Sequence, residues 1–441
     1  MKLLLMLFLA TLISSQVSES QTYPSPILAP GQSEISGGMG ISWIDGTPYY
    51  MIGVIPSLSF GKLGIGLDLT LRLNSADGTI RRVDWAGGAY RKIIRYLSWG
   101  QKHDPIFAKA GQLDGTTIGH GFIMYDYTNS PSYDNRTIGA ELDMDFSKFG
   151  FEAMYGDFHT PGVTGGRVYV RPLKFTEIGD LQVIGGLELG ATYLTDQDEN
   201  SNVGLVIGKS FVPPAPYVPE DRGTLSEYGL DLGMPILRTA HFSSDIYYDF
   251  AQIYHHGHGS GIGINGNFSG LGILDISATV ERQFIGRHFI PEYFDHFYEL
   301  ERYNPQNIPG YISKAEILDS TSASEGWFGH LTLSLMSKLR LVGTFRSINN
   351  DPEGGLLHLQ AEIPELLPHF ALTAGYDRYG ILSFSDIFTL NDQSLFYAFF
   401  GYKPYPFMTI GLNYFWTYYL VDGNYVVQRR MEPSVMVNFS F

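Results

Sequence analysis

The sequence predicts an all-β protein, a single transmembrane antiparallel β-barrel of about 18–20 strands. Three observations predict this fold. Apolar and polar residues alternate with a period of two through most of the chain, short turns alternate with long polar connections, and the last residues form an alternating strand that ends on an aromatic side chain. The first observation predicts strands, and the other two favour a membrane barrel over a soluble sandwich.

The strands are clearest where an unbroken apolar face opposes a polar one. Every odd position from 63 to 73 is leucine or isoleucine, and the segments 138–146, 274–281 and 408–416 repeat the pattern. Side chains two residues apart share one face of a strand, so each segment has an apolar face and a more polar face. A soluble β-sandwich would show the same alternation.

The lengths of the connections distinguish a membrane barrel from a soluble sandwich. Short connections are predicted at 61–62, 100–105, 147–148, 175–180, 235–239, 269–270, 337–338, 364–369 and 403–406. Longer connections fall between many of them, at 74–82, 114–136, 195–226, 284–326 and 379–394. Outer-membrane barrels have tight turns at one end and longer loops at the other, whereas a sandwich has no reason to separate them in this way.

The C-terminal strand places Val435, Val437, Phe439 and Phe441 on one face. This ending resembles the last strand of Gram-negative outer-membrane β-barrel proteins of the porin-like type. The resemblance implies that these four side chains are a membrane-assembly signal read by the barrel assembly machinery. Because it identifies no subfamily, it implies no further site residues.

The N-terminus has the parts of a secretory signal peptide. Lys2 precedes an apolar run at 3–13, and small residues follow up to position 20. The run is too short to span a bilayer, which needs about 20 helical residues. We expect a cleaved signal peptide at 1–20, a short periplasmic leader at 21–37 and the barrel at 38–441, in the bacterial outer membrane.

Composition argues against two other classes of protein, namely disulfide-stabilised scaffolds and nucleic-acid-binding proteins. Hydrophobic residues make up 44% of the chain and charged residues 17%, with 29 Tyr, 29 Phe and 51 Gly, which favours strands, turns and interfacial aromatics. The absence of cysteine excludes a disulfide-stabilised scaffold. A formal charge of −16 argues against nucleic acid as a partner, because binding phosphates needs positive charge.

The alternation also predicts which charged side chains point inward and line a pore. The predicted inward-facing set is Asp68, Arg72, Glu141, Asp143, Asp145, Glu152, Asp249, Asp275, Glu281, Arg340, Arg346, Glu362 and Asp377. Carboxylates outnumber guanidinium groups in this set, which favours cation entry into a water-filled lumen. The triplet of Glu141, Asp143 and Asp145 on one strand needs water, cations or a facing Arg, and it could instead be a solvated face without a role in selectivity.

Two stretches could carry additional chemistry. His255, His256 and His258 could bind Zn²⁺ or Cu²⁺, but their glycine-rich surroundings favour a polar outer loop, and we expect no metal or cofactor. Histidines at predicted outer ends, such as His120 and His159, leave a rim-sited hydrolase open, but the Gly-x-Ser-x-Gly motif is absent and we expect no enzyme.

The connection at 284–326 is long for an unstructured loop and is rich in aromatic and acidic residues. It could fold into the lumen and constrict it, or pack on neighbouring outer loops. The sequence therefore predicts a porin-like channel for passive or weakly selective passage of small solutes, with outer-membrane lipid as its surroundings. The alternatives are a closed barrel with a structural or adhesive role at the cell surface and, less favoured, the hydrolase.

Overall fold

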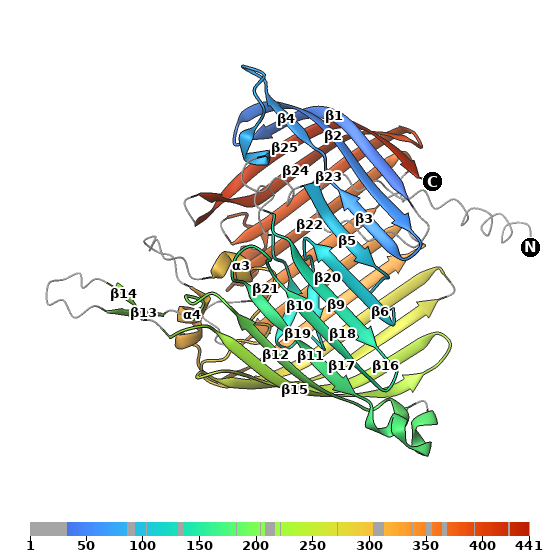
Figure 1. Ribbon diagram of the computed structural model, residues 1–441, viewed down its shortest axis with the longest axis vertical. Coiled ribbons are helices and arrows are strands. Elements are labelled where there is room, and N and C mark those ends of the chain that lie inside the picture. Colours follow the sequence, from blue (N-terminus) through green and yellow to red (C-terminus); the bar gives the residue numbers. More distant parts are fainter. Residues whose placement is uncertain are drawn as a thin grey trace, which may run out of the picture.

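The computed structural model describes residues 33–85, 93–102, 104–130, 136–181, 183–202, 204–207, 217–220, 222–270, 272–302, 313–336, 338–349, 355–363, 368–391, 393–421 and 424–440. Within these residues the fold is a closed antiparallel β-barrel of 20 strands (Figure 1). The barrel closes where the first strand, β1, pairs with both its sequence neighbour β2 and the last strand, β25. This confirms the predicted fold class.

The wall strands follow one another around the ring in sequence order. They are β1 (Glu34–Ile44), β2 (Thr47–Phe60), β3 (Leu63–Leu67), β4 (Leu71–Asn74), β5 (Ile94–Trp99), β6 (Ile106–Gly111), β9 (Gly139–Asp145), β10 (Phe149–Tyr155), β11 (Val163–Val170), β12 (Glu188–Asp196), β15 (Ser226–Arg238), β16 (Phe242–Ile253), β17 (His258–Gly270), β18 (Leu274–Ile285), β19 (Ser324–Leu335), β20 (Leu339–Ile348), β21 (Gly355–Ile363), β22 (Phe370–Ile381), β23 (Ser394–Tyr405), β24 (Met408–Val421) and β25 (Asn424–Ser440).

One wall strand is interrupted, unlike the unbroken strand that the alternation at 63–73 predicts. Both β3 and β4 pair with β2, so together they occupy a single position in the wall. At the break, the backbone N–H of Asp68 donates to the carbonyl of Ile93, and Leu69 exchanges hydrogen bonds with Val54. The odd-numbered apolar residues alone gave no sign of this irregularity.

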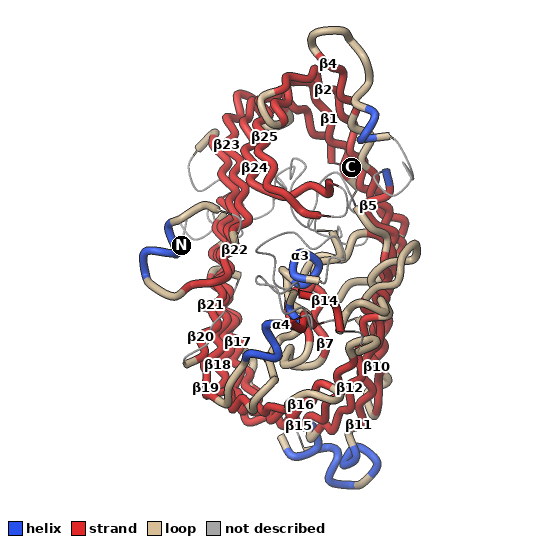
Figure 2. The backbone as a smooth tube through the Cα atoms, turned by 90° about the vertical axis from the view of Figure 1, so that its left-hand side faces the viewer, coloured by secondary structure: helices blue, strands red, loops and turns tan. Residues whose placement is uncertain are grey.

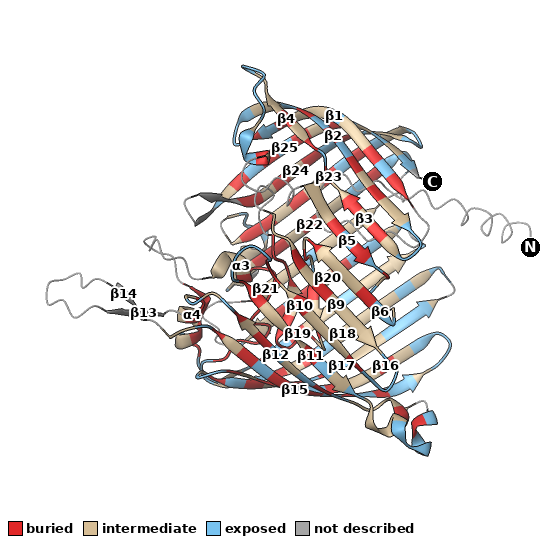
Figure 3. Ribbon diagram, viewed as in Figure 1, coloured by how far each residue is buried: buried red, intermediate tan, exposed pale blue. Residues whose placement is uncertain are grey.

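The alternation of side chains separates an apolar outer face from a polar inner face. On β15, the exposed residues Tyr228, Leu230 and Leu232 alternate with the buried residues Glu227 and Asp231 (Figure 3). Large apolar side chains are exposed on most of the remaining wall strands as well. An apolar outer band around a polar interior is the architecture of outer-membrane β-barrels, which is the type that the C-terminal strand resembles.

The longest connections between wall strands, such as 112–138 and 286–323, lie at one end of the barrel, as predicted, but the turn at 45–46 lies at that end too, and the long connection at 171–187 lies at the other end. Several bounds also differ. Residues 235–238 still belong to β15, because Pro235 lies at a register shift, where its missing N–H is tolerated. Residues 269–270 belong to β17 and residues 403–405 to β23, so those strands are longer than predicted. The connection predicted at 175–180 is instead part of a helical segment with η2 (Pro172–Phe175), η3 (Glu177–Asp180) and η4 (Ile184–Gly186).

The start of the barrel also differs from the expected bound at 38. Strand β1 begins at Glu34, which pairs with Ser57 of β2, because Glu34 and Ser36 continue the inward polar series. The predicted signal peptide at 1–20, most of the leader and Phe441 lie outside the described residues.

The other elements are short. They are η1 (Arg82–Asp84), η5 (Phe384–Phe388), α3 (Tyr298–Glu301), α4 (Lys314–Ser320) and two small hairpins, β7 (Thr116–Ile118) with β8 (Met124–Tyr127), and β13 (Gly204–Ile207) with β14 (Tyr217–Glu220). None of the described helices has the length and apolar character needed to cross a membrane.

Candidate functional site

Two connections fold into the barrel. We name them the first inner segment (residues 112–130) and the second inner segment (residues 286–302 and 313–323). Figure 2 shows β7 of the first and α3 and α4 of the second within the ring of strands. The segments touch each other through a parallel bridge between Met124 and Phe294.

Aromatic and aliphatic side chains of both segments form the largest buried apolar cluster in the described chain. Its inner-segment members include Leu113, Ile118, Phe122, Ile123, Met124, Tyr127, Phe289, Ile290, Tyr293, Phe294, Tyr298 and Leu318. Packing of this kind supplies most of the stability of a folded segment, at about 25 cal/mol per Å² of apolar surface removed from water. The second segment is therefore not an outer loop packed only on its neighbours.

Glycines on the inner face of the wall let these segments approach closely. A Cβ added to Gly259 of β17 would lie 2.5 Å from the ring of Phe289, and one added to Gly229 of β15 would lie 2.8 Å from Ile123. Any larger residue at these positions would push the inner segments away from the wall. The wall sequence is thus matched to the segments that lie against it.

Buried ion pairs anchor the second inner segment. The Arg346 guanidinium of β20 lies 3.3 Å from the Glu292 carboxylate and donates to the carbonyl of Pro291. The Lys314 ammonium lies 2.9 Å from Asp295 and 2.8 Å from Glu301. Burial raises the pKa of Glu292 to about 7, although Arg346 acts in the opposite direction.

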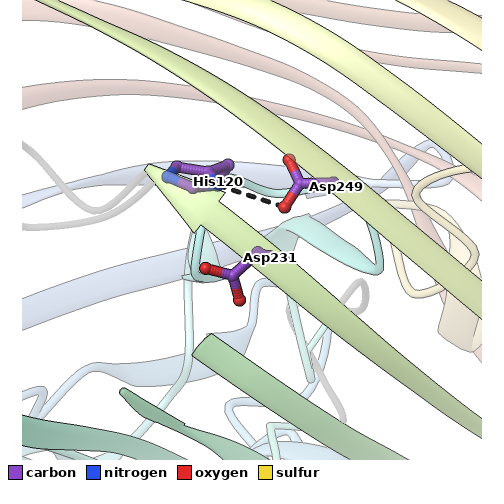
Figure 4. Close-up of side chains that lie close together, drawn as sticks. All are labelled: His120, Asp231 and Asp249. Carbon is purple, nitrogen blue, oxygen red and sulfur yellow. Dashed lines mark hydrogen bonds and ion pairs between the residues drawn. The ribbon is translucent and has the colours of Figure 1, made fainter. Parts of the chain in front are cut away.

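A second polar cluster joins the first inner segment to strands β15 and β16 of the wall (Figure 4). His120 Nδ1 lies 3.1 Å from the Asp249 carboxylate of β16, and the ring stacks on Tyr247. Asp231 of β15 lies beside this pair, and the Arg167 guanidinium binds it at 2.5 and 2.9 Å. The guanidinium supplies the positive charge that these carboxylates need.

A third cluster brings the two inner segments and the wall together. Asp126 of β8, His296 of the second inner segment and Asp377 of β22 each offer a ligand atom, and these atoms all lie within 4.8 Å of one another. His358 of β21 hydrogen-bonds to Asp377 and lies 3.8 Å from Asp126.

The predicted acidic triplet has basic partners. Lys102, on the turn before β6, contacts both Glu141 and Asp143, and Arg171 binds Asp145 through two hydrogen bonds of 2.9 Å. Burial disfavours the charged ammonium, but the two carboxylates outweigh it and raise the pKa of Lys102 to about 12. Asp145 therefore has a facing Arg, whereas Glu141 and Asp143 have a lysine in its place.

The other predicted pore-lining residues divide into buried and exposed groups. Asp68, Arg72, Glu281 and Arg346 are buried, whereas Asp275 and Arg340 are exposed. Asp68 lies 2.9 Å from Arg136, and Glu152 lies 3.2 Å from Arg167. Asp275 accepts a hydrogen bond from Ser269, and Arg340 lies 3.1 Å from Glu362.

The structure places the other predicted features as follows. Val435, Val437 and Phe439 lie on the outer face of β25 with exposed side chains. His256 bonds to Asn202 at 2.8 Å, and the two potential metal-ligand groups found among the described residues contain none of His255, His256 and His258. His120, predicted at an outer end, lies instead on the first inner segment.

Sequence reasoning missed the first inner segment, which was expected to be only a long outer connection. The missed functional candidates are Asp126, Glu292, His296 and His358, and His120 was considered only as a residue of the outer rim. An available signal was the apolar run from Phe122 to Met124, since three consecutive apolar residues are unusual in a solvated loop.

Comparisons with known proteins give weak likenesses. No protein-family model and no curated protein matches the chain. Among solved structures, OccAB2 of Acinetobacter baumannii is 11% identical with a TM-score of 0.31, covering 93% of this chain and 98% of that chain. OccK5 (OpdH) of Pseudomonas aeruginosa is 12% identical with a TM-score of 0.33, covering 95% and 100%. The outer membrane protein opdK of Pseudomonas aeruginosa is 10% identical with a TM-score of 0.33, covering 93% and 99%.

Proposed function

We propose that the protein is an outer-membrane channel for passive or weakly selective passage of small solutes, and not an enzyme. The observation that carries this proposal is the closed barrel of 20 strands with a polar inner face. Barrels of about 16–18 strands already leave an aqueous channel. The surrounding partners are the outer-membrane lipids and, during biogenesis, the barrel assembly machinery.

The inner segments would set the width of the passage. They fill part of the lumen and are fixed by buried contacts, so they act as a constriction and not as a mobile lid. Solutes would pass along the side of the barrel that these segments leave uncovered. Of the predicted pore-lining residues, Asp143, Asp145, Asp275 and Arg340 are not buried and would line that passage, whereas Arg346 lies against the second inner segment.

The proposed charge preference is for cations, and it is weak. It rests on the predicted inward-facing set, in which carboxylates outnumber guanidinium groups. Glu227 and Glu281 add little to it, because a carboxyl group buried without an ion pair favours its neutral form, and within the described part of the chain neither forms one. Lys102, Arg167 and Arg171 neutralise much of the remaining acidic wall. A small surplus of negative charge attracts cations without excluding neutral solutes.

A proteoliposome efflux assay tests the proposal. Refolded mature protein is expected to release small trapped sugars and to retain large dextrans. A heat-unfolded sample from the same preparation is the control for leakage. Retention of the small sugars by vesicles that contain the folded barrel would contradict the proposal.

A further inference from the structure

The connection between β11 and β12 is long, although it lies at the end of the barrel where most turns are short. It contains the three 3₁₀ turns η2, η3 and η4. We name its described residues, 171–181 and 183–187, the helical connection. It is the green coil beyond the end of β11 in Figure 1 and the blue coil outside the ring of strands, beside β11 and β15, in Figure 2.

The interior of the helical connection is filled by its own backbone. The backbone N–H of Thr176 donates to the carbonyl of Leu173 at 3.0 Å, and similar bonds close the other turns. Gly179 and Gly185 are buried where the turns pack on one another. A Cβ added to Gly179 would lie 2.6 Å from the carbonyl oxygen of Leu173, and one added to Gly185 would collide with the backbone of Gly179. The connection therefore has no room inside for its large side chains.

Its large apolar side chains are exposed instead. They recur at every third residue, and each is between 48% and 59% exposed: Phe175, Ile178, Leu181 and Ile184. Four such side chains within ten residues form an apolar surface that water does not solvate well. Exposed apolar surfaces of this kind mark sites of contact with another protein or with a membrane.

The apolar outer band of the barrel leads directly to this surface. Along one row of the wall, Phe149 of β10 pairs with Val170 of β11, and Val170 pairs with Leu189 of β12. Leu189 pairs in turn with Leu232 of β15, and all four side chains are exposed. Because Val170 ends β11 and Leu189 is the second residue of β12, the helical connection begins and ends beside this row. The surface that faces lipid on the wall therefore continues onto the connection.

The charges near the apolar surface balance one another. Lys148 lies 5.0 Å from the centre of the Phe175 ring, and Lys174 belongs to η2. Glu177 and Asp180 of η3 carry the opposite charge and are exposed. Attraction to anionic headgroups is therefore weak, and burial of the apolar side chains is the interaction that would hold the connection at a bilayer.

We propose that the helical connection inserts Phe175, Ile178, Leu181 and Ile184 into the periplasmic leaflet of the outer membrane, at the boundary between headgroups and acyl chains. Interfacial helices bury their apolar side about 5–10 Å deep at this level. A second copy of the chain fits the surface less well, because a standard protein interface takes about 20–30 residues on each side. The connection would fix the depth of the barrel in the bilayer, whether or not the barrel conducts solutes.

Site-directed spin labelling of the full-length barrel in phosphatidylcholine vesicles tests the proposal. The chain contains no cysteine, so a single introduced cysteine can carry the label. Labels at Ile178→Cys and Leu181→Cys should collide more often with oxygen, which concentrates in lipid, than with a water-soluble nickel chelate. A label at Val168→Cys, on the exposed face of β11, is the control for lipid. A label at Ala76→Cys, in the connection after β4 at the opposite end, is the control for water.

Two outcomes of the labelling would overturn the proposal. The first is collision mainly with the nickel chelate at both positions of the helical connection, which would place its apolar surface in water. The second is exclusion of both reagents, with spin–spin broadening that disappears when unlabelled protein is added. That result would assign the surface to a second copy of the chain.

A matched pair of substitutions gives a second readout. Ile178→Ser should lower the urea midpoint of the vesicle-inserted barrel, because it removes an apolar side chain from lipid. Ile80→Ser is the control, since Ile80 is 50% exposed and Ile178 is 48% exposed, but Ile80 lies in the connection after β4. Its midpoint should stay close to that of the native barrel. Equal midpoints of the two variants would contradict insertion of the helical connection.

Discussion

Arg346 of the barrel wall and Glu292 of the second inner segment form a buried ion pair with an N–O distance of 3.3 Å. Each side chain is at most 6% exposed, so neither charge is solvated if its partner is removed. The same guanidinium also holds the carbonyl of Pro291. This pair therefore attaches the second inner segment to the barrel wall.

Changing Arg346 to Met should release the second inner segment. At a pH well above 7, where Glu292 is ionised in the native protein, the loss leaves this carboxyl group buried without its partner, which costs about 3–5 kcal/mol. We expect faster protease cleavage within residues 286–302 and larger, noisier conductance. Arg340→Met is the matched control, because its ion pair with Glu362 is 47% and 24% exposed and should contribute less than about 1 kcal/mol. Equal effects of the two changes would refute the anchoring role.

The attachment of this segment should weaken as pH rises. The pKa of Glu292 is raised from 4.5 to about 7, so the folded state binds the proton more tightly than the unfolded state. The resulting stabilisation is complete below about pH 4.5 and is lost as pH rises through 7. We expect protease resistance of the segment to fall over this interval, and the change to be much smaller in E292Q. An unchanged pH profile in E292Q would assign the effect to another group.

Glu432→Gln should destabilise the barrel where it closes. Glu432 of β25 lies 3.0 Å from Arg72 of β4 and accepts a hydrogen bond from Ser42 of β1 at 2.6 Å. Because both charged groups are at most 2% exposed, losing the carboxylate should cost about 3–5 kcal/mol. Urea unfolding measures this loss, and Glu362→Gln on the exposed pair is the control. A loss in E432Q no larger than in E362Q would contradict the assignment.

Removal of Phe441 should impair assembly in the outer membrane. The prediction follows from the resemblance of the last strand to the signal read by the assembly machinery. The readout is the amount of heat-modifiable barrel in outer-membrane fractions, with Phe60→Ala beside a turn as the control for loss of an exposed aromatic. Normal assembly without Phe441 would remove the support that the C-terminal strand gives.

The wall of this barrel could be predicted from the sequence because the face that a residue occupies in a strand depends only on the residues next to it in the chain. Alternation decides which face each residue occupies, and residues such as Leu230 and Asp231 carry that information without reference to the rest of the chain. The predicted ends of strands were wrong where a strand continues through a register shift. At Pro235 the sequence predicted a turn, because proline ordinarily indicates one, but β15 continues past it.

The interior could not be predicted in the same way. Asp126 and Asp377 are far apart in sequence, and no period or motif indicates that both meet His296. Their proximity depends on two connections that fold inward against glycines of the wall, such as Gly259. The aromatic content of residues 289–299 allowed one inward segment to be considered, but the partner segment around Phe122 was missed.

Single-channel recording in a planar bilayer, with the reversal potential measured across a salt gradient, tests the central claim most directly. The account predicts stable conductance steps from the refolded barrel and a reversal potential with the sign of a weak cation preference. Heat-modifiable mobility of the same sample establishes that the barrel is folded. Persistent silence from a folded barrel would contradict the channel and favour a structural or adhesive role.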